Sequence, residues 1–196
     1  MSGPGRPGKD STPEVRARRW SAIALAVCLL LEERGDAAVR RLWRRLEGLG
    51  VPTLLSHTHG RHVPHLTYAS LRSYDLDRVG HALTALPPRE PLELRFDAFG
   101  TFRRSRCWLA PAVTADLTQR QEAVAAVVAS TGAELHRHYV PGDWVPHLTL
   151  APRLHLNDLP TVAAAVYDVL PLVTVGTTVA LVDTSTGMRH PLPHLV

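Results

Sequence analysis

Two short segments of this sequence are identical. Residues 63–67 and residues 145–149 both read Val-Pro-His-Leu-Thr. In a strand, successive side chains point to opposite faces, so the histidine and the threonine of each copy share one face while the leucine points to the other. The proline before each histidine lacks a backbone donor, which favours an edge or end position in a sheet. Each copy therefore presents an imidazole and a hydroxyl side by side.

The histidine pair, His65 and His147, suits the acid-base chemistry of phosphodiester hydrolysis. An imidazole with a pKa of roughly 6.5 can take a proton from attacking water or give one to a leaving alkoxide near neutral pH. The hydroxyls of Thr67 and Thr149 can hydrogen-bond the non-bridging phosphate oxygens, whose charge must be stabilised during the transfer. We predict these four residues as catalytic, with no metal and no cofactor. The alternative is a pair of half-buried structural histidines followed by strand-forming threonines.

The paired motif resembles that of the two-histidine (2H) phosphoesterase superfamily, and most closely its branch of 2′-5′ RNA ligases and 2′,3′-cyclic nucleotide phosphodiesterases. That family carries two His-x-Ser/Thr-x motifs, matched here by residues 65–68 and 147–150 within a resemblance that covers residues 20–185. The resemblance implies metal-independent hydrolysis of a 2′,3′-cyclic phosphate to a 2′-phosphate, or of a 2′-5′ phosphodiester, on a nucleotide or RNA end. It also implies that His147 is the base that activates water and that His65 is the acid that protonates the departing 3′ oxygen.

The pattern around the motifs recurs as well, which indicates an internal duplication with halves at about residues 20–100 and 101–185. Hydrophobic periodicity predicts strand, helix, strand, helix, strand in each half. The predicted strands lie at 22–31, 63–69, 92–97, 102–110, 144–150 and 172–183, and the predicted helices at 36–49, 75–86, 116–130 and 157–170. We therefore expect an α+β fold of two lobes related by a pseudo-twofold axis, with two antiparallel sheets facing a central cleft and helices outside.

Four further residues are candidates for binding the substrate. A nucleobase needs a flat face to stack on, which Tyr68, Phe102 and Trp144 could supply, with packing in the core as the alternative for each. Many members of the resembled family have a basic residue shortly after the second motif. Pro152 stands at that position here, so the neighbouring Arg153 is the candidate for a phosphate contact.

Two histidine-rich segments lie near the motifs. Residues 57–62 read His-Thr-His-Gly-Arg-His, and residues 136–138 read His-Arg-His. The first run is a metal cluster, a polar loop beside the substrate or a solvated loop. Its spacing fits no standard zinc pattern, and no cysteine or nearby carboxylate completes it, so we predict no metal site. The second run could meet phosphates at the mouth of the cleft.

Composition narrows the class of partner and the compartment. The net charge of +4 favours polyanionic partners such as nucleotides or RNA. Residues 1–18 are rich in glycine, proline and charge, which predicts a disordered tail before a single domain at 19–196. The apolar run at 22–31 is too short to span a bilayer and is followed by acidic residues rather than a cleavage site, so we read it as a buried strand. We expect a cytoplasmic monomer that does not bind membranes.

Two alternatives remain open at this point. Cys28 and Cys107 both lie in apolar runs, which predicts two reduced, buried thiols rather than a disulfide or a reactive thiol. The alternative to an enzyme is a non-catalytic module that binds nucleotides or RNA ends on the same fold. The presence of both histidines and both threonines favours the enzyme.

Overall fold

The computed structural model describes residues 25–103, 106–192 and 195, so the tail predicted at residues 1–18 lies outside the described residues. This part of the chain holds four α-helices and eight β-strands. The helices are α1 (Glu33–Gly48), α2 (Leu76–Thr84), α3 (Ala115–Ser130) and α4 (Leu159–Tyr167). The strands are β1 (Leu25–Leu31), β2 (His65–Ser73), β3 (Leu92–Phe102), β4 (Arg106–Pro111), β5 (Glu134–Leu135), β6 (Leu148–Ala151), β7 (Leu172–Asp183) and β8 (Arg189–Leu192). Two 3-10 turns, η1 (Arg137–Tyr139) and η2 (Leu156–Asp158), flank β6.

The described strands form a single antiparallel sheet, within the predicted α+β class. Its order is β5-β2-β1-β7-β3-β4-β6, and β8 pairs with β7 beside this path. The expected pair of facing sheets is therefore wrong. The reason is the length of β7, whose residues from Gly176 to Asp183 pair with β1 while those from Leu172 to Gly176 pair with β3.

The last strand of each predicted half pairs with the first strand of the other half. β3 forms a hairpin with β4, and β7 lies against β1. Because β3 and β7 also pair with each other, the two exchanged strands hold the middle of the sheet. The sequence halves are thereby joined through one continuous backbone ladder.

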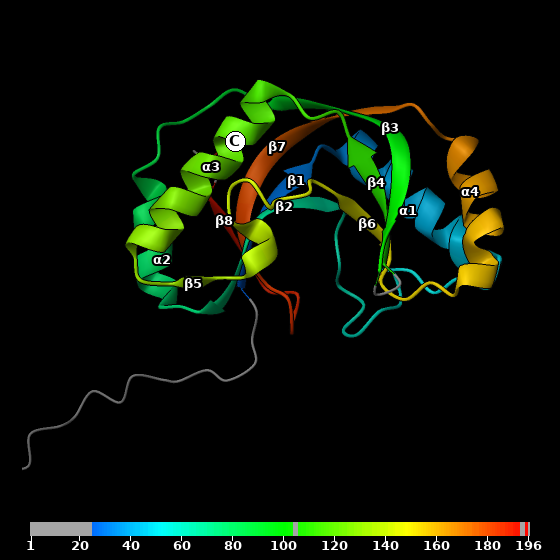
Figure 1. The fold of residues 1–196 in the computed structure, drawn as a ribbon, viewed down its shortest axis with the longest axis horizontal. Helices are drawn as coiled ribbons and strands as arrows, with labels where there is room; N and C mark the ends of the chain where they lie inside the picture. Colours follow the sequence, from blue (N-terminus) through cyan, green and yellow to red (C-terminus); the bar gives the residue numbers. More distant parts are fainter. Residues whose placement is uncertain (1–24, 104–105, 193–194, 196) are drawn as a thin grey trace, which may run out of the picture.

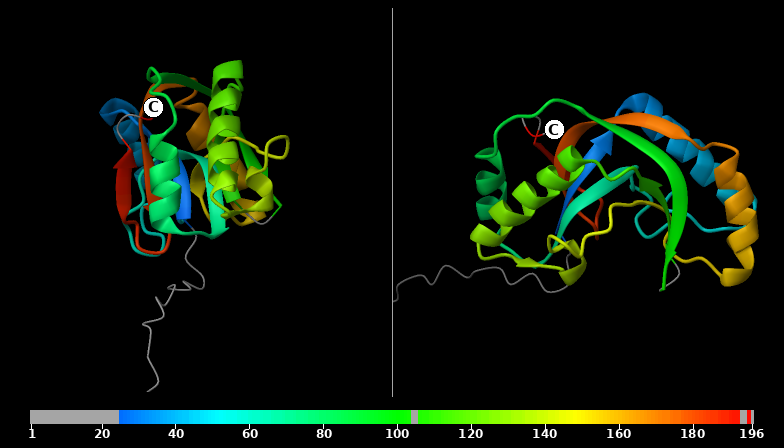
Figure 2. Two further views of the ribbon diagram at one scale, coloured as in Figure 1. Left: turned by 90° about the vertical axis from the view of Figure 1, so that its left-hand side faces the viewer. Right: turned by 45° about the horizontal axis from the view of Figure 1, so that its top comes forward.

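The sheet is strongly curved, which brings the two motif-bearing strands together (Figure 1; Figure 2). β2 and β6 lie near opposite ends of the strand order, yet they contact each other. A backbone hydrogen bond of 3.2 Å from the Leu54 N–H to the Leu150 carbonyl also ties the loop before β2 to β6. The curvature of this single sheet therefore brings the two motifs close together, which the prediction had assigned to two facing sheets.

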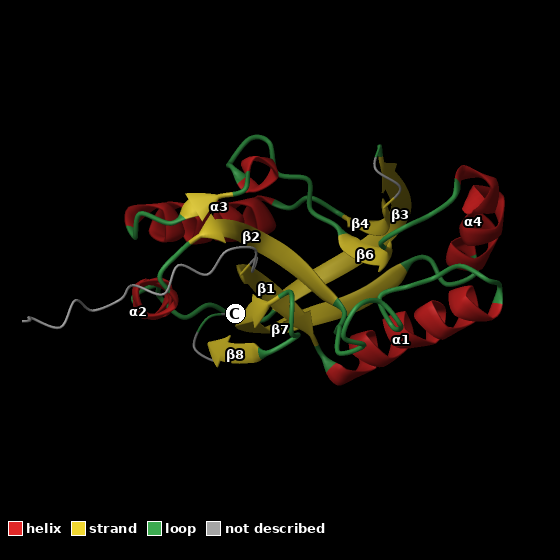
Figure 3. Ribbon diagram, turned by 90° about the horizontal axis from the view of Figure 1, so that it is seen from below, coloured by secondary structure: helices red, strands yellow, loops and turns green. Residues whose placement is uncertain are grey.

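The helices lie in two pairs at opposite ends of the sheet, α1 with α4 and α2 with α3 (Figure 3). α1 buries a stripe of side chains at helical spacing: Val39, Leu42, Trp43 and Leu46. On β1, every second residue from Leu25 to Leu31 joins the same apolar core, so Cys28 points to the other face of the sheet.

Both cysteines are free and buried, as predicted, and they lie on different sides of the sheet. Cys107 of β4 belongs to the apolar core, whereas Cys28 does not. Among the described helices, none is long and apolar enough to cross a membrane. The described part of the apolar run at 22–31 is the buried strand β1, as predicted.

Three predicted elements differ most from the structure. The strand expected at 144–150 begins only at Leu148, as β6. The strand expected at 102–110 contains a chain reversal, because β3 runs on to Phe102 and β4 begins at Arg106. Both arms of this hairpin carry apolar residues, so the periodicity continues across the turn and hides it. The helix expected from Asn157 begins at Leu159, after the 3-10 turn η2.

Candidate active site

The two motifs meet where β2 and β6 come together. His65 is the first residue of β2, and His147 directly precedes β6. The two imidazoles are close enough for the charge of His65 to act on His147. We refer to His65, Thr67, His147 and Thr149 together as the paired-histidine site.

Each imidazole is oriented by the backbone of its own motif. His65 Nδ1 lies 2.6 Å from the Val63 carbonyl oxygen, and His147 Nδ1 lies 2.7 Å from the Val145 carbonyl oxygen. A carbonyl oxygen can only accept a hydrogen bond, so Nδ1 carries a hydrogen in both rings. Nε2 is therefore the nitrogen left for proton transfer with a substrate. Both histidines are half-buried.

The two copies of the motif have different neighbours on the adjacent strand. Cys28 of β1 is paired with Thr67, and Trp108 of β4 is paired with Thr149. The Cys28 Sγ lies 3.7 Å from the Thr67 Oγ1, and the Cys28 side chain is also in hydrogen-bond contact with His65. A thiol therefore lies against the first histidine, whereas an indole takes the equivalent register position beside the second motif.

Aromatic rings surround His147. The ring centroid of Phe102 lies 4.9 Å from that of His147 with an interplanar angle of 88°, and the centroid of Trp108 lies 6.0 Å from it. The rings of Phe102 and Trp108 pack against each other at 4.9 Å. Gly100 makes room for the indole, because a Cβ at this position would come within 2.5 Å of the Trp108 ring. Of the predicted aromatic residues, Phe102 thus lies beside a motif histidine.

These surroundings shift the pKa values of the two histidines in opposite directions. Burial disfavours a charge on His147 more than its backbone bond favours one, and the charges of His65 and Arg106 add to the effect, which lowers the pKa of His147 to about 4. Burial also opposes a charge on His65. There, the negative charge and the hydrogen bond that Cys28 can supply, with the backbone bond, outweigh burial and raise the pKa of His65 to about 9. At neutral pH, His65 is protonated and His147 is neutral.

Tyr139 belongs to the site although sequence reasoning did not identify it. Its side chain hydrogen-bonds Thr67, and its backbone carbonyl accepts a 2.8 Å hydrogen bond from Gln121 Nε2. Burial, with the nearby Cys28, raises the pKa of Tyr139 to about 12, so its hydroxyl keeps its proton. Tyr139 stands in the turn η1, where no periodic pattern marks a side chain as facing β2.

The sequence matches the profile of the family described as the 2′-5′ RNA ligase superfamily over residues 33–187. The chain belongs to the 2′-5′ RNA ligase superfamily. This confirms the predicted family. No curated protein matches the sequence at a significant level.

Solved structures share the fold of this superfamily member. One described as a phosphoesterase is 17% identical, with a TM-score of 0.56 over 87% of this chain and 94% of that chain. E. coli LigT complexed with NADP+ is 18% identical, with a TM-score of 0.53 over 89% of this chain and 95% of that chain. E. coli LigT complexed with 3′-AMP is 15% identical, with a TM-score of 0.54 over 87% and 94%.

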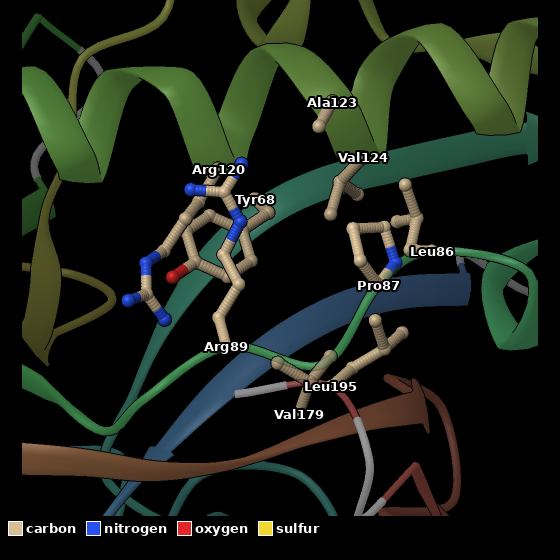
Figure 4. Close-up of a pocket in the computed structure, with 9 residues that line it drawn as sticks. All are labelled: Tyr68, Leu86, Pro87, Arg89, Arg120, Ala123, Val124, Val179 and Leu195. Atoms are coloured by element: carbon tan, nitrogen blue, oxygen red, sulfur yellow. The ribbon is translucent and has the colours of Figure 1, made fainter.

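In this superfamily member, Tyr68 lies away from the paired-histidine site. Neighbouring strand residues point to opposite faces, so Tyr68 cannot share a face with Thr67. Its side chain is 1% exposed and lines a cavity of about 50 Å³ with Arg89 and Arg120 (Figure 4). The prediction that Tyr68 stacks on a nucleobase is therefore wrong. Trp144 is half-buried, and its ring centroid lies 6.3 Å from that of Tyr68, so this indole lies against the strand of the first motif.

Two arginines place positive charge near the site. The exposed Arg153 acts on His57, in the loop before the first motif. Arg106, also exposed, acts on His147 as well as on His57 and His136, and it lowers the pKa of each. Arg106 is therefore better placed than Arg153 to meet an anion at the His147 imidazole. Sequence reasoning missed Arg106 because the predicted strand at 102–110 concealed the hairpin end on which it stands.

The histidine-rich loop at 57–62 packs on itself beside the first motif. The ring centroids of His59 and His62 are 4.2 Å apart, and the Thr58 Oγ1 lies 2.9 Å from the His62 Nε2. Burial and neighbouring histidines, His65 among them, lower the pKa of His62 to about 4. In the described ranges, no three His, Cys, Asp or Glu side chains are arranged to hold a metal ion. The loop is therefore a polar segment that lies beside the first motif.

Proposed function

We propose that this protein is a phosphodiesterase acting on nucleotide or RNA ends, which hydrolyses a 2′,3′-cyclic phosphate to a 2′-phosphate or cleaves a 2′-5′ phosphodiester. The observation that carries the proposal is that β2 and β6 contact each other and that each motif histidine bonds its own backbone through Nδ1, which leaves both Nε2 atoms for proton transfer. Hydrolysis by acid-base catalysis needs one protonated and one neutral group at the same pH, and here a duplicated motif supplies both. The family and the nucleotides bound by E. coli LigT support the substrate class.

The protonation states of the two histidines support a different role for each. His147 donates its Nδ1 hydrogen to Val145, so its Nε2 lone pair takes a proton from water. The water oxygen forms a bond to phosphorus while the bond from phosphorus to the 3′ oxygen breaks. Protonated His65 then gives its Nε2 proton to that departing oxygen, which leaves the phosphate on the 2′ oxygen. Exchange of protons with solvent returns both histidines to their starting states.

The remaining residues hold the phosphate and the base. Thr67 and Thr149 donate hydrogen bonds to the non-bridging oxygens, whose negative charge is also met by Arg106. The rings of Phe102 and Trp108, packed beside His147, provide the face on which a nucleobase stacks.

Incubation of the purified protein with 2′,3′-cyclic nucleotides, followed by chromatography that resolves 2′- from 3′-phosphates, tests the proposal. We expect the 2′-phosphate, formed equally well in EDTA because two imidazoles perform both proton transfers. His65→Gln and His147→Gln should each lower kcat/KM by about 10²–10⁴-fold. His81→Gln, an exposed histidine of α2, is the matched control and should change neither activity nor Tm. Tight binding of the nucleotides without turnover would instead support the non-catalytic module.

A further inference from the structure

The two halves of the paired-histidine site have the same motif but not the same chemistry. His65 and His147 are flanked by identical residues, and each donates Nδ1–H to the carbonyl two residues before it. Local sequence therefore cannot make one an acid and the other a base. The difference must come from residues that the fold brings to each motif from elsewhere.

We propose that Cys28 is a positioning residue for His65, whose thiol keeps this imidazole oriented and protonated for the acid step. The inference rests on the proposed function, since it explains how one of two equivalent histidines becomes the acid. Cys28 acts through the His65 imidazole, and no bond to its sulfur forms or breaks.

The geometry around Cys28 supports this role. Its side chain is fully buried on the face of β1 opposite the apolar core, directly across from Thr67. Sγ lies 3.7 Å from the Thr67 Oγ1, and the thiol also contacts the His65 ring. A sulfur in this place can accept a hydrogen bond and carry negative charge, whereas an indole N–H can only donate. Trp108, at the equivalent position of the second motif, therefore cannot support a charged imidazole in this way.

The other titratable groups that face His65 carry no charge in the range where it loses its proton. The pKa values of His62, in the preceding loop, and of His147, across the site, are both about 4, so both imidazoles are neutral there. Tyr139 keeps its proton next to Thr67 and so carries no charge near neutral pH. Of the described side chains around this ring, Cys28 is the one that favours its protonated form, in agreement with the raised pKa of His65.

NMR titration of the His65 ring in the full-length protein tests the inference without any need for turnover. Cys28→Ala removes the thiol and its hydrogen bond, so the His65 midpoint should move down by about one pH unit or more, a tenfold or greater loss of proton affinity. Cys28→Ser keeps a hydrogen bond without an ionisable thiol, so its midpoint should lie between the other two. Cys107→Ala, at the other buried thiol, is the matched control and should leave the midpoint unchanged. Circular dichroism checks that each variant is folded.

The pH dependence of kcat/KM gives the second readout. The alkaline limb should move to lower pH in Cys28→Ala, to an intermediate pH in Cys28→Ser, and not at all in Cys107→Ala, while the acid limb stays in place. An unchanged His65 midpoint in Cys28→Ala would overturn the inference. If the wild-type protein hydrolyses none of the nucleotides, the proposed function fails, and the NMR titration still decides whether Cys28 controls His65.

Discussion

The Nε1 of Trp144 lies 3.0 Å from the backbone carbonyl oxygen of Thr67. This hydrogen bond joins the segment before the second motif to the strand of the first. β2 and β6 are not hydrogen-bonded neighbours in the sheet, although they contact each other. Across the site, this side-chain bridge and the backbone hydrogen bond from Leu54 to Leu150 hold the two motifs together, without direct pairing of β2 with β6.

Loss of this bridge should impair catalysis more than folding. Trp144→Phe keeps a ring against Tyr68 but leaves the Thr67 carbonyl without its donor, which should lower the free energy of unfolding by about 1–3 kcal/mol. We expect kcat to fall more than KM rises, because the histidines lose their alignment while the phosphate contacts remain. Urea denaturation and steady-state kinetics measure both. Trp43→Phe is the control, since the indole Nε1 of this buried residue has no hydrogen-bond partner among the described residues; equal loss of kcat in both variants would contradict the role of the bridge.

The pH profile of kcat/KM should be a wide bell. Activity rises as His147 loses its proton near pH 4 and falls as His65 loses its proton near pH 9. Because the two rings interact, the limbs belong to the pair rather than to either residue alone. Initial rates measured from pH 3.5 to 10, with stability checked at each pH, test this. A steady decline through pH 6 to 7 would show instead that both rings act as cations that only bind phosphate.

The same protonation equilibria should change stability with pH. The pKa of His147 is about 4 in the folded protein and roughly 6.5 when unfolded, so the unfolded chain binds this proton first. The stabilisation is complete above pH 6.5 and is lost as pH falls through 4. His147→Gln removes this term, so it should be more stable relative to wild type at pH 4.5 than at pH 7.5. Urea midpoints at the two pH values provide the comparison, and an identical difference at both would refute the expected shift.

The motif threonines should act mainly on the transition state. Thr67→Val and Thr149→Val each remove a hydroxyl from the developing phosphate charge, which should lower kcat by about 10²-fold with a smaller change in KM. Thr67→Val should also lower Tm, because its hydroxyl contacts Cys28 and Tyr139. Thr118→Val is the control, at a half-buried residue of α3 whose hydroxyl donates to the Thr114 carbonyl. A pure rise in KM would assign the hydroxyls to ground-state binding.

The position of the Trp108 indole should depend on the absence of a side chain at Gly100. Gly100→Ala places a Cβ within 2.5 Å of this ring, so the indole and the Phe102 ring that packs on it must shift. We expect weaker nucleotide binding, measured as a rise in KM or in the Kd of a 2′-nucleotide. Gly80→Ala, whose Cβ meets its nearest atom at 3.7 Å, is the matched control and should leave binding unchanged. Unaltered KM in Gly100→Ala would remove Trp108 from the base-binding surface.

The sequence by itself determined the α+β class and the family, and it predicted the four residues of the paired-histidine site. These follow from local rules, because the alternation of side chains in Val-Pro-His-Leu-Thr is fixed by backbone geometry within a few residues. The same alternation places Tyr68 on the opposite face from Thr67, away from the paired-histidine site. Most strands and helices were also close to their predicted positions, since periodicity reports which face of an element is buried.

Only the tertiary structure decided two features: the number of sheets, and which of the two histidines has the higher pKa. Strand pairing depends on contacts between residues far apart in the chain. The local pattern therefore does not predict that β7 pairs with both β1 and β3. It also does not predict the register, which places Cys28 beside Thr67 and Trp108 beside Thr149. Proton affinity depends in turn on burial and on neighbouring charge, both of which exist only once the chain is folded. The duplicated motif supplied two equivalent histidines, and their unequal surroundings in the folded sheet made them different.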